Sequence, residues 1–294
     1  MKKILVLGGT SFFGRELVQR LINNHHSVTI FSRGRKTPFF DSDPKFIIGD
    51  RKNLQDLKKI DFSGFDIVFD QIGFCADDSK LLVDAIGNAQ PHLVFTSSQS
   101  VYNAGENLKE DALDPNSHRY DLGNYESQDY GEAKRQAEAY YFQKANFPVS
   151  IIRPSIVFGP DDKTGRFQFH VNKISRGKPF FLPNRDAKIS MLYSKDAAKA
   201  LEYIGLNPQE RQVYNLSTGE LSLQKVMRAI ANGIEGKINL LSSPSPELYS
   251  PYGATSDWWM NREKIKSILP RTEQDLIKLI EETAIYEDNN QSES

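Results

Sequence analysis

The sequence predicts an α/β fold, a doubly wound parallel sheet with a smaller C-terminal lobe. Short strands that are apolar along their whole length recur through the first half, and helical segments separate most of them. Such strands are typical of a parallel sheet with both faces covered by helices. After about residue 160, Pro, Gly and Ser become frequent and this rhythm weakens, which predicts the second, less regular lobe.

Apolar runs predict six strands, at residues 4–7, 28–31, 46–48, 66–72, 92–98 and 149–155. Helical spacing predicts helices at residues 10–23, 53–59, 78–89 and 130–145. Right-handed crossovers between successive parallel strands place such helices on both faces of the sheet.

The composition excludes several classes of protein. The 294 residues carry a formal net charge of −1, so no overall basic field attracts nucleic acid or an anionic membrane. Cys75 is the only cysteine, which rules out an intramolecular disulfide and a Cys-rich metal site. The first apolar run, residues 4–7, is too short for a signal peptide or a membrane span. We therefore expect a cytoplasmic protein without a metal, membrane or nucleic-acid partner; a homodimer is compatible with the sequence.

A glycine-rich turn, "LGGTSFFG", joins the first strand to the first helix. A helix start presents unpaired N–H groups and a partial positive charge. Glycines at such a turn allow the backbone to approach a pyrophosphate closely. The alternative is a tight turn that binds nothing. The residues predicted to meet the cofactor here are Gly8, Gly9, Thr10, Ser11, Phe12, Phe13 and Gly14.

The residues after the second and third strands bear on which dinucleotide binds. An acid after the second strand would bond the ribose 2′-hydroxyl of NAD, but this chain has Ser32 and Arg33. A hydroxyl and a guanidinium suit a 2′-phosphate, which modestly favours NADP over NAD. The alternative is a solvated basic loop. Asp50, followed by Arg51, is placed to meet the adenine amino group, or to cap the next helix, or both.

A tyrosine and a lysine four residues apart, Tyr130 and Lys134, share one face of a predicted helix. A phenol with an ordinary pKa near 10 exchanges protons poorly at neutral pH, and a neighbouring cation favours the phenolate. The same helix carries a second such pair, Tyr140 and Lys144. We prefer Tyr130 because it opens the helix, whereas Tyr140 lies in an apolar stretch.

Polar residues also close two of the predicted strands. Ser97 and Ser98 end the fifth strand, at the edge where open α/β sheets bind ligands. A hydroxyl there can donate to a substrate oxygen as charge develops on it. Asp70 and Gln71 end the fourth strand and need partners in a substrate, a cofactor or the next helix.

Four motifs in order, "LGGTSFFG", "FTSSQSVY", "YGEAK" and "IIRPSIVFGP", make the chain resemble the extended short-chain dehydrogenase/reductase family, in its NAD-dependent epimerase/dehydratase group. The resemblance runs over most of the chain. It implies a Rossmann fold, NAD or NADP as cofactor, and hydride transfer to or from a sugar or sugar-like alcohol. Residues 1–160 would form the dinucleotide-binding domain. Residues 161–294 would be mainly a substrate-binding lobe, with 189–217 returning to the Rossmann core.

The resemblance also implies roles for individual residues. Tyr130 would be the general acid/base, Lys134 would bind the nicotinamide ribose, and Ser98 would hold the substrate oxygen. Further cofactor contacts would come from Arg51, Gln71, Ile72, Gly73, Ser97, Pro154, Ser155, Ile156 and Val157. Candidate substrate contacts are Phe74, Gln99, Arg185 and Lys188.

The chain departs from the family pattern at three places. Ser11 replaces the middle glycine of the turn, as in the branch that contains the RNA-associated chloroplast stem-loop-binding proteins. Gln99 and Ser100 stand where sugar-nucleotide dehydratases carry an acidic pair, which disfavours dehydration. Ile189 stands where an arginine grips the substrate diphosphate. The alternative function is therefore a non-catalytic Rossmann-fold nucleotide-binding protein, acting as a cofactor sensor or associated with RNA.

Overall fold

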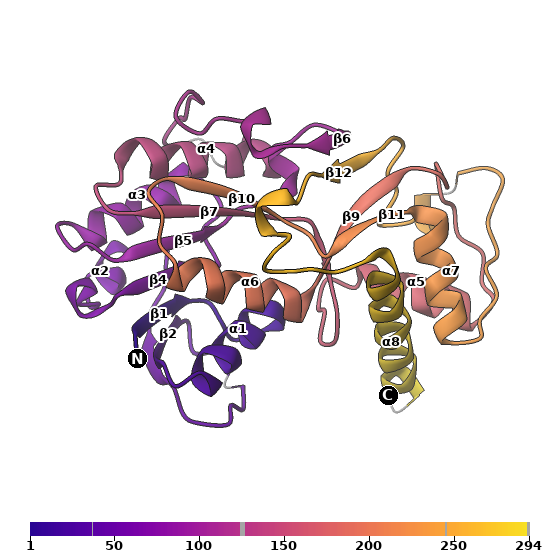
Figure 1. The fold of residues 1–294 in the computed structure, drawn as a ribbon, viewed down its shortest axis with the longest axis horizontal. Helices are drawn as coiled ribbons and strands as arrows, with labels where there is room; N and C mark the ends of the chain where they lie inside the picture. Colours follow the sequence, from indigo (N-terminus) through magenta and orange to yellow (C-terminus); the bar gives the residue numbers. More distant parts are fainter. Residues whose placement is uncertain (37, 124–126, 245, 293–294) are drawn as a thin grey trace.

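A seven-stranded sheet forms the centre of the larger of two lobes (Figure 1). The computed structural model describes residues 1–36, 38–123, 127–244 and 246–292. The strands lie in the order β10 (Gln212–Leu216), β7 (Val149–Pro154), β5 (His92–Thr96), β4 (Ile67–Asp70), β1 (Lys3–Leu7), β2 (Ser27–Ser32) and β3 (Lys45–Ile48). Every neighbouring pair is parallel, and the strand order reverses between β1 and β4. The predicted doubly wound sheet is confirmed, and its switch point is where such sheets bind ligands.

Helices cover both faces of this sheet. One face carries α1 (Phe12–Asn23) and α6 (Ser194–Leu206), and the other carries α3 (Ala76–Ile86) and α4 (Tyr130–Lys144). The short helix α2 (Leu54–Leu57) follows β3. Alternate residues of β1 enter the two apolar cores, because successive side chains of a strand point to opposite faces.

Two predicted strands end earlier than expected. The runs at 66–72 and 92–98 continue only to Asp70 and Thr96. Beyond Thr96 the chain turns into a short 3₁₀ helix, Gln99–Val101, which Ser98 caps by accepting a hydrogen bond from Ser100 N. After β4, Asp70 Oδ1 accepts a hydrogen bond from Ile72 N, so a local polar contact follows the end of each strand.

The smaller lobe is built on a second sheet. Its strands are β11 (Gly219–Ser222), β9 (Lys188–Tyr193), β12 (Trp258–Met260) and β6 (Gly105–Leu108), with β8 (Ile156–Phe158) also paired to β9. Helices α5 (Arg166–Ser175), α7 (Leu223–Gly233) and α8 (Glu273–Ser292) enclose its core (Figure 1). Of the segment 189–217, α6 and β10 lie with the larger sheet. Strand β9 instead joins the smaller one, because it pairs with β8, β11 and β12.

A buried ion pair fixes α4 against the larger sheet. Arg153 on β7 donates to Glu138 on α4, with Nη2–Oε2 at 2.6 Å and Nε–Oε1 at 3.0 Å, and both side chains are fully buried. Arg153 also donates to the hydroxyl of Tyr102 and to two backbone carbonyls. Such bidentate pairing sets both distance and orientation, so this contact holds in place the helix that carries Tyr130 and Lys134.

Replacing Glu138 with Ala should leave the Arg153 charge buried without its partner. We expect the free energy of unfolding to fall by about 3–5 kcal/mol, measured by urea denaturation at pH 7. Glu263→Ala is the control, because Glu263 and its partner Lys266 are both exposed, and such a pair contributes roughly 0–1 kcal/mol. Equal losses in the two variants would contradict this account of α4.

Candidate functional site

The glycine-rich turn brings the start of α1 against the ends of β1 and β4. Gly8 and Gly9 have φ of 101° and 75°, a region that glycine adopts readily. A Cβ on Gly9 would lie 2.9 Å from side-chain atoms of both Val6 and Val18, and one on Gly14 would lie 3.3 Å from the Gly9 Cα. Ser11 occupies the N-cap position of α1, is exposed, and makes no capping bond with its hydroxyl. The turn therefore presents a close-packed backbone and one hydroxyl at the switch point of the sheet.

A cavity of about 660 Å³ opens at the carboxyl edge of the sheet and extends between the lobes. Ser98, Tyr130 and Lys134 all line it. The other sequence-predicted residues in its wall are Phe12, Phe13, Gln71, Phe74, Ser97, Gln99, Pro154, Ser155, Ile156 and Val157. Residues that are far apart in the sequence thus meet around one space.

A glycine that the sequence analysis missed brings Tyr130 beside Ser98. A Cβ on Gly131 would lie 2.3 Å from the Ser100 carbonyl oxygen, so only glycine lets α4 begin against the turn that Ser98 caps. Asp129 caps α4 by accepting a hydrogen bond from Glu132 N at 2.8 Å. A glycine directly after the first residue of a helix was the available signal.

The ammonium of Lys134 is buried at the end of β5. Its Nζ donates to the carbonyl oxygens of Gly73 at 2.6 Å and Thr96 at 2.7 Å, and the side chain is 3% exposed. Burial lowers the pKa of the Lys134 ammonium to about 8, and the carboxylate of Asp70 opposes this shift. The same Nζ lies 5.9 Å from the ring centroid of Tyr130, so a cation sits beside the candidate acid/base.

Unpartnered polar atoms concentrate around this cavity. Buried polar groups in folded proteins are nearly always hydrogen-bonded. In the described part of the chain, all the buried side-chain polar atoms without a partner belong to residues lining the cavity, except those of Gln168 and Trp259. The residues concerned are Gln71, Thr96, Ser97, Gln99, Ser155, Tyr252 and Trp258. Their amides, hydroxyls and indole N–H are neutral groups that a polar ligand can satisfy.

The smaller lobe supplies cavity residues that the sequence analysis missed. Tyr252, Arg166 and Trp258 line it. The carbonyl of Trp258 accepts a hydrogen bond from Gln99 Nε2 at 2.7 Å, while Gln99 Oε1 has no partner. Gln99 therefore links the 3₁₀ helix to β12 and also presents an acceptor to the cavity. Residues 241–256 show no periodicity, so no local signal pointed to Tyr252.

The side chain of Arg51 is buried and does not line the cavity. Its side chain is 4% exposed, and its Nη2 lies 2.5 Å from Asp70 Oδ2. The carboxylate of Asp70, the last residue of β4, is fully buried and needs a cation, which explains why Arg51 turns inward. Asp50 remains exposed and accepts a bond from Lys52 N, whereas Asn53 is the cap of α2. The interpretation of Asp50 as that cap was wrong.

Arg185 and Lys188 do not line the cavity. Arg185 lies in a separate depression of about 280 Å³ beside α7. Lys188 is exposed at the start of β9, whereas the next residue, Ile189, lines the cavity. Adjacent strand residues point to opposite faces, so a substrate that contacts Ile189 does not meet Lys188.

The remaining predicted residues lie near the cavity or at the end of β2. Ile72 and Gly73 lie in the loop after β4, and a Cβ on Gly8 would touch the side chain of Ile72 at 3.0 Å. Ser32 ends β2 and accepts a hydrogen bond from Gly34 N, and Arg33 is exposed beside it. Neither Ser32 nor Arg33 lines the 660 Å³ cavity.

Two features of the described residues bear on the class of the site. No three His, Cys, Asp or Glu side chains in these residues gather in a way that could hold a metal ion. Within the same ranges, no helix has both the length and the apolar character needed to cross a membrane.

A family model supplies the deciding comparison. The model of the NAD dependent epimerase/dehydratase family matches residues 4–217, most of the chain. The chain belongs to this family. A curated member that it resembles is the chloroplast stem-loop binding protein of 41 kDa b from Arabidopsis thaliana, 30% identical over 236 residues. That match covers 74% of this chain and 58% of the relative, so the chain spans little more than half of the relative's length.

Solved structures of this family share the fold. UDP-N-acetylglucosamine 4-epimerase from Methanobrevibacter ruminantium superposes with a TM-score of 0.75 at 19% identity, covering 100% of this chain and 99% of that one. The dTDP-glucose 4,6-dehydratase from Bacillus anthracis, solved with NAD, has a TM-score of 0.75 at 17% identity, with 99% and 98% covered. At these identities the likeness establishes the architecture of both lobes.

The lowered pKa of Lys134 predicts a pH-dependent stability. Between pH 8 and 10.5 the unfolded chain holds a proton on this lysine that the folded chain has lost, so its contribution to stability rises with pH over this window. Lys134→Met removes the contribution. The free energy of unfolding of this variant, minus that of the unmodified protein, should therefore be about 3 kcal/mol lower at pH 10.5 than at pH 7. Denaturant unfolding at the two pH values measures this difference.

Lys144→Met, the same change at the exposed end of α4, is the matched control. If Lys134→Met differs from the unmodified protein by the same amount at both pH values, the ammonium is not buried as described.

Proposed function

We propose that this family member binds NAD or NADP and transfers a hydride to or from a sugar or sugar-like alcohol, as an epimerase or reductase. One observation carries the proposal. Ser98, Tyr130 and Lys134 meet in a cavity at the switch point of the sheet, and that cavity concentrates the unpartnered buried polar atoms of the described chain. The similar structures named above are a nucleotide-sugar epimerase and an NAD-bound dehydratase.

The residues present fit a dinucleotide. The turn from Gly8 to Gly14 packs its backbone closely at the start of α1, where unpaired N–H groups would attract the pyrophosphate. Asp50 would meet the adenine, Lys134 the nicotinamide ribose, and residues 154–157 the nicotinamide. When bound, the nicotinamide supplies the hydride acceptor or donor that the side chains lack.

Tyr130, Lys134 and Ser98 would then handle the substrate hydroxyl. The phenol of Tyr130 takes the proton of the substrate hydroxyl or returns it. Backbone carbonyls hold two of the three N–H donors of Lys134, which leaves the third for the ribose or for Tyr130. Ser98 Oγ accepts from Ser100 N, and its own hydrogen can be donated to the substrate oxygen. These roles match hydride transfer coupled to proton transfer.

The neutral polar wall supports a polyhydroxylated substrate. Gln71, Ser97 and Ser155 present amide and hydroxyl groups from the larger lobe, and Tyr252 and Trp258 present a phenol and an indole N–H from the smaller one. Sugar hydroxyls both donate and accept hydrogen bonds, so they can satisfy all of these groups.

Tyr130→Phe tests the catalytic role. We expect turnover to fall by about 10²–10⁴-fold while the affinity for NAD or NADP is kept, because the phenol acts on the proton alone. Small molecules released from the purified protein are first identified by mass spectrometry, and turnover is then assayed on sugars and carbonyl compounds with both cofactors.

Tyr140→Phe is the matched control, since Tyr140 belongs to the second Tyr-x-x-x-Lys pair on the same helix. Unchanged turnover in Tyr130→Phe, or no binding of either dinucleotide by the unmodified protein, would overturn the proposal.

Arg33→Ala tests the choice of dinucleotide. If Arg33 pairs with a 2′-phosphate, its loss should weaken NADP binding roughly tenfold and leave NAD binding unchanged, as measured by calorimetry. Arg35→Ala is the control, because Arg35 is also exposed and lies two residues further on. Equal affinities for NADP in both variants would argue that Arg33 is part of a solvated loop and would favour NAD.

A second candidate is a non-catalytic nucleotide-binding protein associated with RNA. The similarity to a chloroplast stem-loop binding protein favours it, together with Ser11 in the glycine turn. The net charge of −1 and the Ser98, Tyr130 and Lys134 set favour the enzyme. Retained cofactor without turnover, with binding to an RNA stem-loop that survives Tyr130→Phe, would decide for the second candidate.

A further inference from the structure

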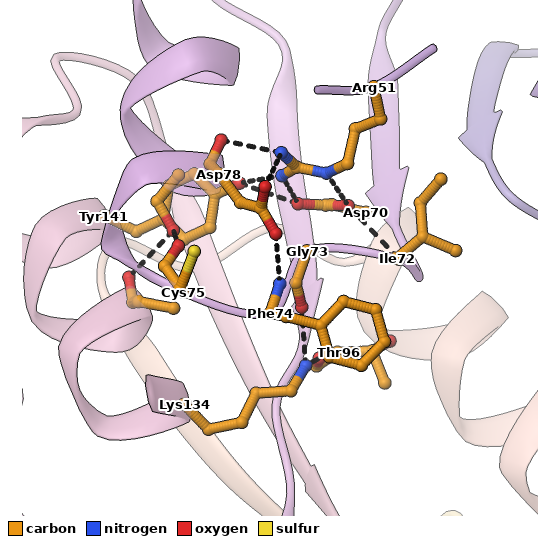
Figure 2. Close-up of polar contacts among 12 residues, drawn as sticks. Arg51, Asp70, Ile72, Gly73, Phe74, Cys75, Asp78, Thr96, Lys134 and Tyr141 are labelled. Carbon is orange, nitrogen blue, oxygen red and sulfur yellow. Dashed lines mark hydrogen bonds and ion pairs between the residues drawn. The ribbon is translucent and has the colours of Figure 1, made fainter. Parts of the chain in front are cut away.

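A buried ionic cluster and Lys134 lie on opposite sides of Gly73 and Phe74 (Figure 2). Arg51 and Asp70 are paired at 2.5 Å, and Arg51 Nη1 lies 3.6 Å from Asp78 Oδ1. The hydroxyl of Tyr141 donates to Asp70 at 2.7 Å. The cluster draws on the β3–α2 loop, β4, α3 and α4, and none of its four residues lines the cavity. Its role therefore does not involve direct contact with a ligand.

The cluster holds the backbone of residues 72–74 on both sides of Gly73. Asp70 Oδ1 accepts a hydrogen bond from Ile72 N at 3.3 Å, and Asp78 Oδ2 accepts one from Phe74 N at 2.8 Å. A Cβ on Gly73 would lie 2.5 Å from Asp70 Oδ2 and 2.8 Å from Arg51 Nη2. The loop thus lies directly on the ion pair, and Gly73 is the residue that allows this close approach.

This loop provides one of the two carbonyls that hold the Lys134 ammonium. Figure 2 shows the Gly73 carbonyl pointing away from the cluster toward Lys134, at 2.6 Å from Nζ. The other acceptor, Thr96, belongs to β5 and is held by the sheet. Phe74 follows in the same loop, and its ring centroid lies 5.0 Å from Nζ. The position of the ammonium therefore depends on where the loop is held.

We propose that Arg51, Asp70 and Asp78 are positioning residues that set the location of the Lys134 ammonium by clamping the 72–74 loop. The importance of that location for catalysis rests on the proposed function. A planar guanidinium between two carboxylates is a rigid unit, because its donors form a fixed fork. The buried Arg51 thus acts through the 72–74 loop on Lys134, which lines the cavity.

The charged and titratable groups facing Lys134 come from several elements. Asp70 and Arg51 act from the cluster, Asp78 from α3, and Glu138 and Tyr130 from α4. A test of the proposal must therefore separate the loss of a charge from the release of the loop.

Asp78→Asn and Asp78→Ala make this separation. Both remove the same charge, but only Ala removes the acceptor for Phe74 N. The readout is the pH midpoint of Lys134 acylation by acetic anhydride, followed by mass spectrometry. Because burial lowers the pKa of Lys134 to about 8, we expect this midpoint near pH 8 in the unmodified protein. Release of the loop exposes the ammonium to water, so we expect the midpoint of Asp78→Ala to lie about one pH unit above that of Asp78→Asn. Equal midpoints would overturn the proposal.

Two further variants keep the test decisive if Asp78→Ala does not fold. Gly73→Ala forces the loop off the ion pair while every charge stays in place, and we expect it to raise the midpoint in the same direction. Tyr141→Phe removes the hydroxyl that donates to Asp70 and accepts from Arg51 Nη2, but it removes no contact to the loop, so its midpoint should match that of the unmodified protein. A shift in Tyr141→Phe as large as in Gly73→Ala would mean a general loss of packing and would overturn the proposal.

Titration with NAD and with NADP separates this proposal from the proposed function. The acylation midpoint requires no ligand, so it decides the positioning role even if the unmodified protein binds neither dinucleotide, in which case the proposed function alone fails. Where a dinucleotide binds, we expect Asp78→Ala to bind it about tenfold more weakly than Asp78→Asn. Equal affinities together with equal midpoints would leave the cluster without a positioning role.

Discussion

The burial of one ammonium, that of Lys134, is the interaction on which the candidate site depends. A buried cation must be hydrogen-bonded, and here the two acceptors are backbone carbonyls of Gly73 and Thr96. Both carbonyls lie at the carboxyl edge of the sheet: Thr96 is the last residue of β5, and Gly73 lies in the loop after its parallel neighbour β4. The parallel architecture thus creates the binding place for the lysine, and α4 brings the lysine to it.

Two buried arginines then fix the surroundings of that ammonium. Arg153 pairs with Glu138 and holds α4 against β7, while Arg51 pairs with Asp70 and lies under the loop that contains Gly73. One ion pair positions the helix that carries the lysine, and the other positions one of its acceptors. Buried ion pairs contribute little net stability, but their fixed geometry suits them to setting the position of neighbouring groups.

The cavity beside this arrangement differs in character from its supports. The supports are charged and fully paired, whereas the wall combines two cationic side chains, Lys134 and Arg166, with neutral groups from both lobes whose hydrogen bonds are unsatisfied. A ligand that enters therefore meets neutral donors and acceptors over most of the wall. This contrast separates the groups that organise the site from those that would recognise a substrate.

The sequence by itself determined the parallel sheet, the glycine-rich turn and the pairing of Tyr130 with Lys134, because each rests on local spacing: apolar runs, a strand-to-helix turn, and one face of a helix. Only the tertiary structure decided the direction of Arg51 and the membership of Tyr252 and Trp258 in the cavity. Arg51 turns inward because a buried carboxylate, Asp70, ends β4, a strand three positions away in the sheet from β3, which Arg51 follows. Trp258 reaches the cavity because β12 pairs with β9 and β6, contacts that join segments far apart in the chain and leave no periodic trace in the sequence.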